Sequence, residues 1–202
     1  LTETDIDRGF DLPYTRLPHP KYKEKIIPAY EMIKHSVTAH RGCFGGCSFC
    51  AITAHQGRRI VSRTEESILR EVKAVTAMPD FKGYVSDIGG PSANMYRMHG
   101  EDESICGKCM RMSCIYPLLC ANLSFDHRPL IDLYGKCEKV PGVKRVFISS
   151  GVRYDLLICG DEIKRKKYSC DEYTKKLITG HVSGRLKVAP EHTSSRVLKF
   201  MR

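Results

Sequence analysis

Residues Ser36–Cys50 read SVTAHRGCFGGCSFC and join a predicted strand, Ser36–His40, directly to a cysteine-rich loop. The loop has the spacing C-x3-C-x2-C, formed by Cys43, Cys47 and Cys50. Three thiolates on one glycine-rich loop can ligate three irons of a cubane cluster and leave the fourth iron open. Zinc fits less well, because it usually takes four ligands from paired cysteines or histidines. The remaining alternative is a set of three structural thiols.

The strand before the cysteines is the first of four that alternate with helices. The other strands are predicted at 83–88, 145–150 and 186–189, and the helices at 62–78, 130–141, 173–180 and 194–202. The first helix carries a predicted capping box, with Ser62 as N-cap and Glu65 three residues later. Such alternation indicates a parallel sheet, open or closed into a barrel, whose sites lie at the carboxyl ends of the strands. The residues that follow these strands are therefore predicted to share one edge with the cysteines: Gly89, Gly90, Ser150, Arg153 and Glu191.

Composition and charge narrow the class of protein. The 202 residues are enough for one core, and 42% hydrophobic with 28% charged residues is typical of globular proteins. No run approaches the roughly 18 apolar residues of a membrane span, so a soluble, cytoplasmic protein without a membrane partner is expected. The net charge of +10 fits either nucleic-acid binding or a solvated basic surface. The ten cysteines are clustered, which in a reducing compartment indicates metal binding.

A second group of cysteines lies in a stretch without clear periodicity. Its members are Cys106, Cys109, Cys114 and Cys120. Three or four thiols in so short a segment can hold a second iron–sulfur cluster or a zinc ion, with His99 or His127 as a further ligand. A reduced loop without metal is the alternative.

Four motifs at or near the ends of the predicted strands stand out: Arg41–Cys47, Ser86–Tyr96, Ser150–Asp155 and Lys187–Thr193. Together with the C-x3-C-x-aromatic-C loop, they resemble the radical S-adenosylmethionine (SAM) superfamily, and within it the YgiQ family. The resemblance covers most of the chain from about Pro28 onward and implies an α/β fold, a partial (β/α) barrel. It implies an N-terminal extension at 1–35 and a radical SAM core at 36–202, with a Cys-rich insertion at about 99–128.

The ends of the chain predict a piece of a longer protein. The sequence has no initiator Met, and it stops at Arg202 within a predicted helix. The superfamily core has six β-α units, whereas four are predicted here, so about two further units are expected beyond Arg202.

The resemblance also implies cofactors and a reaction type. Cys43, Cys47 and Cys50 are expected to bind a 4Fe–4S cluster, whose open iron chelates the amino and carboxylate groups of SAM. An electron from a flavodoxin- or ferredoxin-like donor then cleaves SAM to methionine and a 5′-deoxyadenosyl radical, which abstracts hydrogen from the substrate. The substrate and any catalytic acid or base are not implied, and a nucleic acid is one candidate. The alternative function is a metal-stabilised RNA-binding module without catalysis.

Some expected SAM contacts lie in the first half of the chain. Gly89 and Gly90 occupy the place of the superfamily's Gly-Gly-Glu motif, where the backbone receives the SAM amino group. Pro91 replaces the Glu, so only the backbone role is implied. A plain turn is the alternative for this pair. Phe49 is expected to pack near the adenine, with a core aromatic as its alternative.

The other expected contacts follow the third and fourth strands. Ser150 and Arg153 correspond to polar contacts with the SAM carboxylate or ribose, although an ordinary surface arginine is an alternative for Arg153. Glu191 corresponds to an acceptor for ribose hydroxyls or the SAM ammonium, and a helix-entry cap is its alternative. In the second group of cysteines, the resemblance implies that Cys109, Cys114 and Cys120 recur in the family, whereas Cys106 is an addition.

Overall fold

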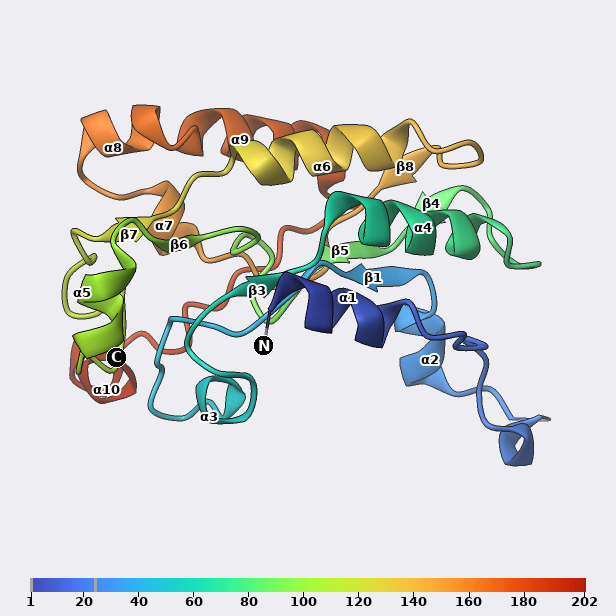
Figure 1. Ribbon diagram of the computed structural model, residues 1–202, viewed down its shortest axis with the longest axis horizontal. Coiled ribbons are helices and arrows are strands. Elements are labelled where there is room, and N and C mark those ends of the chain that lie inside the picture. Colours follow the sequence, from blue (N-terminus) through green and yellow to red (C-terminus); the bar gives the residue numbers. More distant parts are fainter. Residues whose placement is uncertain (1, 24) are drawn as a thin grey trace.

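Figure 1 shows a computed structural model of the chain, which describes residues 2–23 and 25–202. Its helices are α1 (Glu3–Phe10), α2 (Pro28–Ile33), α3 (Ile52–Gln56), α4 (Glu65–Thr76), α5 (Glu103–Lys108), α6 (Arg128–Glu138), α7 (Tyr154–Leu157), α8 (Glu162–Lys167), α9 (Cys170–Lys176) and α10 (Ser195–Met201). Its strands are β1 (Ser36–Thr38), β2 (His40–Arg41), β3 (Val61–Ser62), β4 (Tyr84–Val85), β5 (Asp87–Gly89), β6 (His99–Gly100), β7 (Leu123–Ser124) and β8 (Arg145–Val146). A 3-10 turn lies at Pro20–Tyr22 and a π-helical turn at Leu177–His181. None of the helices described is both long and apolar enough to cross a membrane.

Parallel strand pairing forms the centre of the fold. β1 pairs with β5, with Val37 opposite Ile88, and β4 pairs with β8, with Val85 opposite Val146. Only Ser86 separates β4 from β5, so this segment is one interrupted strand that pairs with β1 on one edge and β8 on the other. Antiparallel pairs join β2 to β3 and β6 to β7. The described residues thus contain four two-stranded sheets, which confirms a mixed α/β fold with parallel pairing.

Helices pack against these strands (Figure 1). α4 contacts β1 and α6 contacts β8, and the two helices also contact each other. α1 contacts β3 and lies against the first turn of α4, where Asp7 accepts the N–H of Thr64 over 3.1 Å. The predicted helical spacing is confirmed in α4, where Ile68, Val72 and Val75 are fully buried. The same is true of α6, whose buried residues include Leu130, Leu133, Tyr134 and Cys137. These apolar faces, packed against the strands, make one core that supports the strand ends.

The fourth predicted strand, 186–189, is wrong. This segment makes a single parallel bridge, from Val188 to Val152. Its apolar side chains are not held in the core, because Leu186 is 41% exposed and Val188 is 45% exposed. Charged Arg185 and Lys187 alternate with them, so one of the two faces of the segment is charged, whereas a strand of a covered parallel sheet is apolar on both faces.

The predicted capping box of the first long helix is also wrong. The N-cap of α4 is Thr64, whose hydroxyl oxygen accepts the N–H of Ser67 over 3.1 Å. Ser62 instead lies in β3, where its hydroxyl oxygen accepts the N–H of Arg97 over 2.8 Å. Ser62 pairs with His40 of β2 and is therefore part of a strand, so the helix begins two residues later than the Ser-x-x-Glu pattern predicts.

The N-terminal extension begins with α1, a helix that the sequence pattern did not predict. Its N-terminus is capped by the reciprocal hydrogen bonds of Thr2 and Asp5. The arm after α1 is attached to the core through Arg16, which donates to the carbonyl oxygen of Ser36 over 2.7 Å and pairs with Glu71 of α4. This attachment positions the arm beside β1, the strand that leads to the cysteine loop.

Candidate metal centre

The three cysteines of the first loop meet at one cavity. Cys43, Cys47 and Cys50 all line a space of about 290 Å³, and all three thiols are free. Gly46 shapes the loop with a φ angle of 62°, which side chains rarely adopt. Space is lacking there too, because an added Cβ would overlap the carbonyl oxygen of Met112. The loop thus depends on glycine to bring the thiols together.

Hydrogen-bond donors point at two of the three sulfurs. The N–H of Gly45 donates to Cys43 Sγ over 3.4 Å, and Arg153 Nη1 donates to Cys47 Sγ over 3.6 Å. The hydroxyl of Ser92 lies 4.0 Å from Cys43 Sγ. Burial raises the pKa of the Cys43 thiol, while the Gly45 N–H and the Ser92 hydroxyl act in the opposite direction. Donors of this kind stabilise the thiolate form that a metal requires.

The donor set fits an iron–sulfur cluster better than a single ion. Within the part of the chain that the structure describes, no three His, Cys, Asp or Glu side chains are grouped closely enough to hold one metal ion. In a cubane cluster each thiolate binds a different iron, so the ligand sulfurs lie farther apart than those around one zinc ion. Three thiols on one cavity, with N–H donors beside two of the sulfurs, are compatible with this arrangement.

Arg153 is fixed on the cavity wall by Asn94 and Asp155. Asn94 is fully buried; it accepts the N–H of Arg153 over 2.8 Å and donates to its carbonyl oxygen over 3.2 Å. The guanidinium donates to Asp155 through Nε at 3.2 Å and through Nη2 at 2.6 Å. Burial opposes the charge of Arg153, but the hydrogen bonds and charges of Asp155 and Cys47 outweigh it and raise the pKa of Arg153. A permanent positive charge therefore lies beside Cys47.

Three of the expected SAM contacts line the same cavity: Phe49, Arg153 and Glu191. Phe49 is 53% exposed, so its aromatic ring is not part of the core. Glu191 has a φ angle of 64°, in the left-handed region, which costs a residue other than glycine about 1 kcal/mol or more. Such strain is common at binding sites, where surrounding structure holds a side chain in an unfavourable backbone conformation.

The other three expected contacts, Gly89, Gly90 and Ser150, lie behind the cavity wall. Residues adjacent to them in sequence form that wall: Pro91, Ser92 and Gly151. The hydroxyl of Ser150 donates to the carboxylate of Asp87, which also accepts the Ser150 N–H over 3.0 Å. Gly90 packs so closely on the ring of His40 that an added Cβ would lie 2.6 Å from it. These residues support the wall through their backbone and their packing.

Sequence reasoning missed several residues that build the site. Asn94 and Asp87 both lie in the Ser86–Tyr96 motif, yet their partners follow β8, far along the chain, and only the fold brings them together. Arg202, at the end of α10, donates through Nη1 to the carbonyl oxygen of Gly46 over 3.4 Å. The hydroxyl of Ser48 donates to the carbonyl oxygen of Phe200 over 2.6 Å. The end of α10 therefore covers the cysteine loop.

The second group of cysteines is joined to the first loop. The N–H of Cys114 donates to the carbonyl oxygen of Phe44 over 3.0 Å. Burial raises the pKa of the Cys114 thiol, and the neighbouring thiols Cys120, Cys106 and Cys109 raise it further, in that order. The other three thiols of the group therefore lie within electrostatic range of Cys114, although no three of them are close enough together to hold a single metal ion.

The suggestion that His127 supplies a ligand to this group is wrong. His127 Nε2 lies 3.2 Å from Asn94 Nδ2, and His127 Nδ1 lies 3.3 Å from the carbonyl oxygen of Tyr168. Both ring nitrogens thus have polar partners in the core, and the residue is fully buried. Its role is to connect Asn94, and through it Arg153, to the packed helices.

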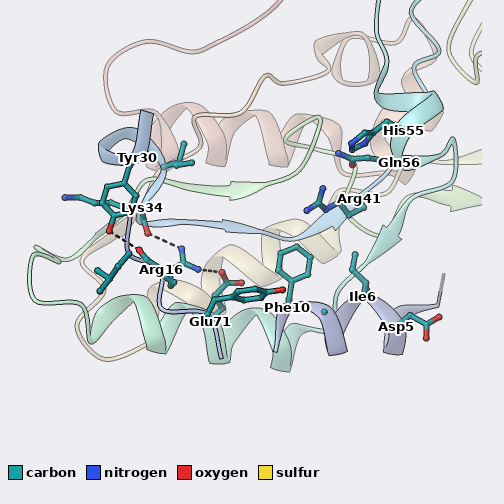
Figure 2. Close-up of a pocket in the computed structure, with 14 residues that line it drawn as sticks. Asp5, Ile6, Phe10, Arg16, Tyr30, Lys34, Arg41, His55, Gln56 and Glu71 are labelled. Atoms are coloured by element: carbon teal, nitrogen blue, oxygen red, sulfur yellow. Dashed lines mark hydrogen bonds and ion pairs between the residues drawn. The ribbon is translucent and has the colours of Figure 1, made fainter. Parts of the chain in front are cut away.

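A larger cavity, of about 760 Å³, lies between the N-terminal arm and the core (Figure 2). Its lining comes from α1, α2, β2, α3, α4 and the arm. Arg16 crosses it to reach Glu71, while Tyr30 donates to the Arg16 carbonyl oxygen over 2.9 Å. Arg41 stacks its guanidinium on the ring of Phe10 at 5.6 Å. The charged groups at the centre of this cavity are largely paired with one another.

Comparison with known proteins identifies the family. Residues 1–36 match the family described as Radical SAM N-terminal. The whole chain is 62% identical to a UPF0313 protein of Bacteroides thetaiotaomicron and 63% identical to one of Porphyromonas gingivalis. The chain belongs to the radical SAM superfamily. A UPF0313 protein of Methanocella arvoryzae is 52% identical over 201 residues. The chain covers 33%, 32% and 32% of these three relatives, and thus spans about a third of the length of the curated relatives that it matches.

Proposed function

We propose that this chain forms the cluster- and SAM-binding part of a radical SAM enzyme. The observation that carries the proposal is the cavity where Cys43, Cys47 and Cys50 meet with N–H donors beside two of their sulfurs. These three cysteines would hold a 4Fe–4S cluster, which, when reduced by a flavodoxin- or ferredoxin-like protein, would supply the electron for cleavage of SAM to methionine and a 5′-deoxyadenosyl radical. The substrate that loses hydrogen is not defined by these residues.

The chain's own residues would bind SAM along the cavity wall. Phe49 presents a half-exposed ring next to Cys50, which suits stacking against adenine. Glu191 lines the same cavity from the segment that precedes α10. Its carboxylate can accept hydrogen bonds from ribose hydroxyls or from an ammonium group. Arg153 is one of the two arginines of the lining, and we assign it to the SAM carboxylate.

Gly89, Gly90 and Ser150 would support this binding from behind the wall. Gly89 is buried against Ser150, and an added Cβ there would lie 3.2 Å from the Ser150 hydroxyl oxygen. The close packing fixes the Pro91–Ser92 and Gly151 segments that face the cavity. We assign these three residues a backbone role in receiving the SAM amino group and in shaping the wall.

The test is electron paramagnetic resonance of the complete protein after anaerobic reconstitution with iron and sulfide. The reduced wild type is compared, with and without SAM, with the Cys43→Ala, Cys47→Ala, Cys50→Ala triple variant; Cys159→Ala serves as a control outside both cysteine loops. We expect a cluster signal that SAM changes, and we expect the triple variant to lose this SAM response. A SAM response that survives in the triple variant contradicts the ligand assignment.

We also propose a second metal site at Cys109, Cys114 and Cys120. Support comes from the hydrogen bond that joins Cys114 to the first loop and from the electrostatic effect of Cys120, Cys106 and Cys109 on its thiol. Cys106 is the remaining thiol in this neighbourhood, and its Sγ accepts from Asn122 Nδ2 over 3.3 Å. Such a site would hold a second iron–sulfur cluster close to the first loop; a zinc ion would require the thiols to move closer together than the structure places them.

A further inference from the structure

The donors of Arg153 are divided between one carboxylate and one sulfur. Nε and Nη2 donate to Asp155 at 3.2 Å and 2.6 Å, whereas Nη1 donates to Cys47 Sγ at 3.6 Å. The two residues that share this last contact are 106 positions apart in the chain, so the contact is made by the fold and not by local geometry. Nη1 is thus the part of the guanidinium directed at the metal centre.

The guanidinium has little freedom to leave this position. Asn94 holds the backbone of Arg153 from both sides, and Asn94 itself is buried and faces His127 Nε2 at 3.2 Å. On the other side of the guanidinium lies Gly45, where an added Cβ would lie only 3.1 Å from Arg153 Nη1. The arginine therefore fits into a space that the glycine leaves beside the cysteine loop.

A fixed cation beside a ligand sulfur acts on the redox equilibrium of the metal centre. Reduction adds one negative charge to the cluster and its thiolates, and hydrogen bonds to the sulfurs are among the factors that set the potential. A positive charge and an N–H donor at Cys47 stabilise the reduced, more negative form more than the oxidised form. Their effect is to raise the midpoint potential.

We propose that Arg153 is a positioning residue that raises the reduction potential of the cluster through its contact with Cys47, with Asp155 reducing the effect of its charge. This inference rests on the proposed function, because it requires a cluster at Cys43, Cys47 and Cys50. It extends that function by giving Arg153 a role toward the cluster itself, because the partner of Nη1 is the ligand sulfur of Cys47.

The test is a potentiometric titration of the reconstituted complete protein without SAM. The redox state of the cluster is monitored by its optical absorption and its electron paramagnetic resonance signal. Arg153→Gln should shift the midpoint to a more negative potential, and Arg153→Lys, which keeps the charge but loses the fork, should shift it less. Asp155→Asn should shift it in the opposite direction, to a more positive potential. Arg165→Gln is the control, since Arg165 also pairs with an aspartate, Asp171 at 3.0 Å, but is not in the cavity lining.

Opposite shifts for Arg153→Gln and Asp155→Asn are the expected result, because a merely structural role would not reverse sign between the two. An unchanged midpoint in Arg153→Gln overturns the inference while leaving the proposed function intact. If Arg153→Gln fails to assemble a cluster, Arg153→Lys and Asp155→Asn decide, and unchanged midpoints in both overturn the inference. A wild type without a cluster that responds to SAM defeats the proposed function instead.

Discussion

The N–H of Cys114 donates to the carbonyl oxygen of Phe44 over 3.0 Å, so the main chain itself joins the two cysteine-rich loops. The contact extends to the next residues, because Gly46 packs directly on the carbonyl oxygen of Met112. Two loops that are some distance apart in sequence thus form one unit, with cysteines from both. Disturbing this junction should affect both groups of cysteines at once.

Gly46→Ala tests the junction. The substitution combines an unfavourable φ of 62° with an overlap between the new Cβ and the Met112 carbonyl oxygen. Gly57→Ala is the matched control, because its φ of 93° is also positive while nothing lies within 4 Å of the added Cβ. We expect Gly57→Ala to cost about 1–3 kcal/mol, because its φ of 93° and ψ of 165° suit only glycine, and Gly46→Ala to cost more because the overlap adds to the strain, as measured by denaturant unfolding. An equal loss of unfolding free energy in the two variants would show that Gly46 does not pack tightly against the second cysteine-rich loop.

Metal analysis tests the second group of cysteines. If Cys109, Cys114 and Cys120 hold metal, their joint replacement by Ala should lower the iron or zinc content of the complete protein while the SAM response of the first cluster remains. Cys106→Ala should give a smaller loss if Cys106 only accepts from Asn122 and does not bind metal. Metal content equal to that of the wild type in the triple variant would leave a reduced, metal-free loop as the correct description.

The sequence predicted the elements that depend on local patterns. The apolar spacing of Ile68, Val72 and Val75 predicted α4, and these residues are buried as expected. The spacing of the first three cysteines predicted that they would meet, and all three line one cavity. In both cases the signal lies within a few residues of the feature, so one sequence is enough to read it.

The rest depended on contacts between distant residues. The Arg153–Cys47 hydrogen bond joins residues 106 positions apart, and the Asn94–Arg153 pair joins residues 59 positions apart. The helix α1 did leave a local signal in the Thr2–Asp5 capping box, but the prolines and charges of the arm around it favoured an extended chain.

RNA binding by the basic surface stays a prediction.

The pH dependence of stability should show the burial of His127. Burial lowers the pKa of His127 to about 4 from 6.5, while the carbonyl of Tyr168 and the charge of Asp126 oppose the shift. The folded state therefore keeps the ring neutral where the unfolded state is protonated, so stability is full above pH 6.5 and is lost as the pH falls toward 4. For a shift of this size the loss from His127 alone is about 2 kcal/mol at about pH 5.

His127→Gln should remove this part of the pH dependence. The quantity to measure is the free energy of unfolding at about pH 7 and at about pH 5 for the wild type, His127→Gln and the control His99→Gln, at an exposed position. We expect the variant at 127 to lose less stability on acidification than the other two proteins. The same loss in all three would mean that other groups control the acid response.

The buried arginine Arg63 should matter far more to stability than the exposed Arg70. The Arg63 side chain is 0% exposed; it pairs with Glu71 and donates to the carbonyl oxygen of Thr38 over 2.9 Å. Arg63→Ala leaves buried acceptors without a partner and should cost about 3–5 kcal/mol. Arg70 pairs with Asp11 at 2.6 Å but is 57% exposed, so Arg70→Ala should cost at most about 1 kcal/mol. Denaturant unfolding measures the loss of unfolding free energy in both variants. Similar losses would show that the buried arginine is no more important to stability than the exposed one.

Glu191 allows fold stability and cofactor binding to be separated at one position. Its φ of 64° strains any residue except glycine, and its side chain is exposed at the cavity. Glu191→Gly should therefore leave the unfolding free energy unchanged within about 1 kcal/mol, because relief of strain offsets the greater entropy lost by glycine on folding. Glu191→Gln keeps the strained backbone and removes only the charge.

Both substitutions should weaken SAM binding to the reconstituted protein by about tenfold, the loss typical of one charge-assisted hydrogen bond. Glu172→Gln, another exposed glutamate, is the control and should bind SAM as the wild type does. If Glu191→Gly and Glu191→Gln both bind SAM normally, the carboxylate does not contact the cofactor, and the strained conformation serves the entry into α10 instead. If only Glu191→Gly binds poorly, the backbone conformation rather than the carboxylate shapes the site.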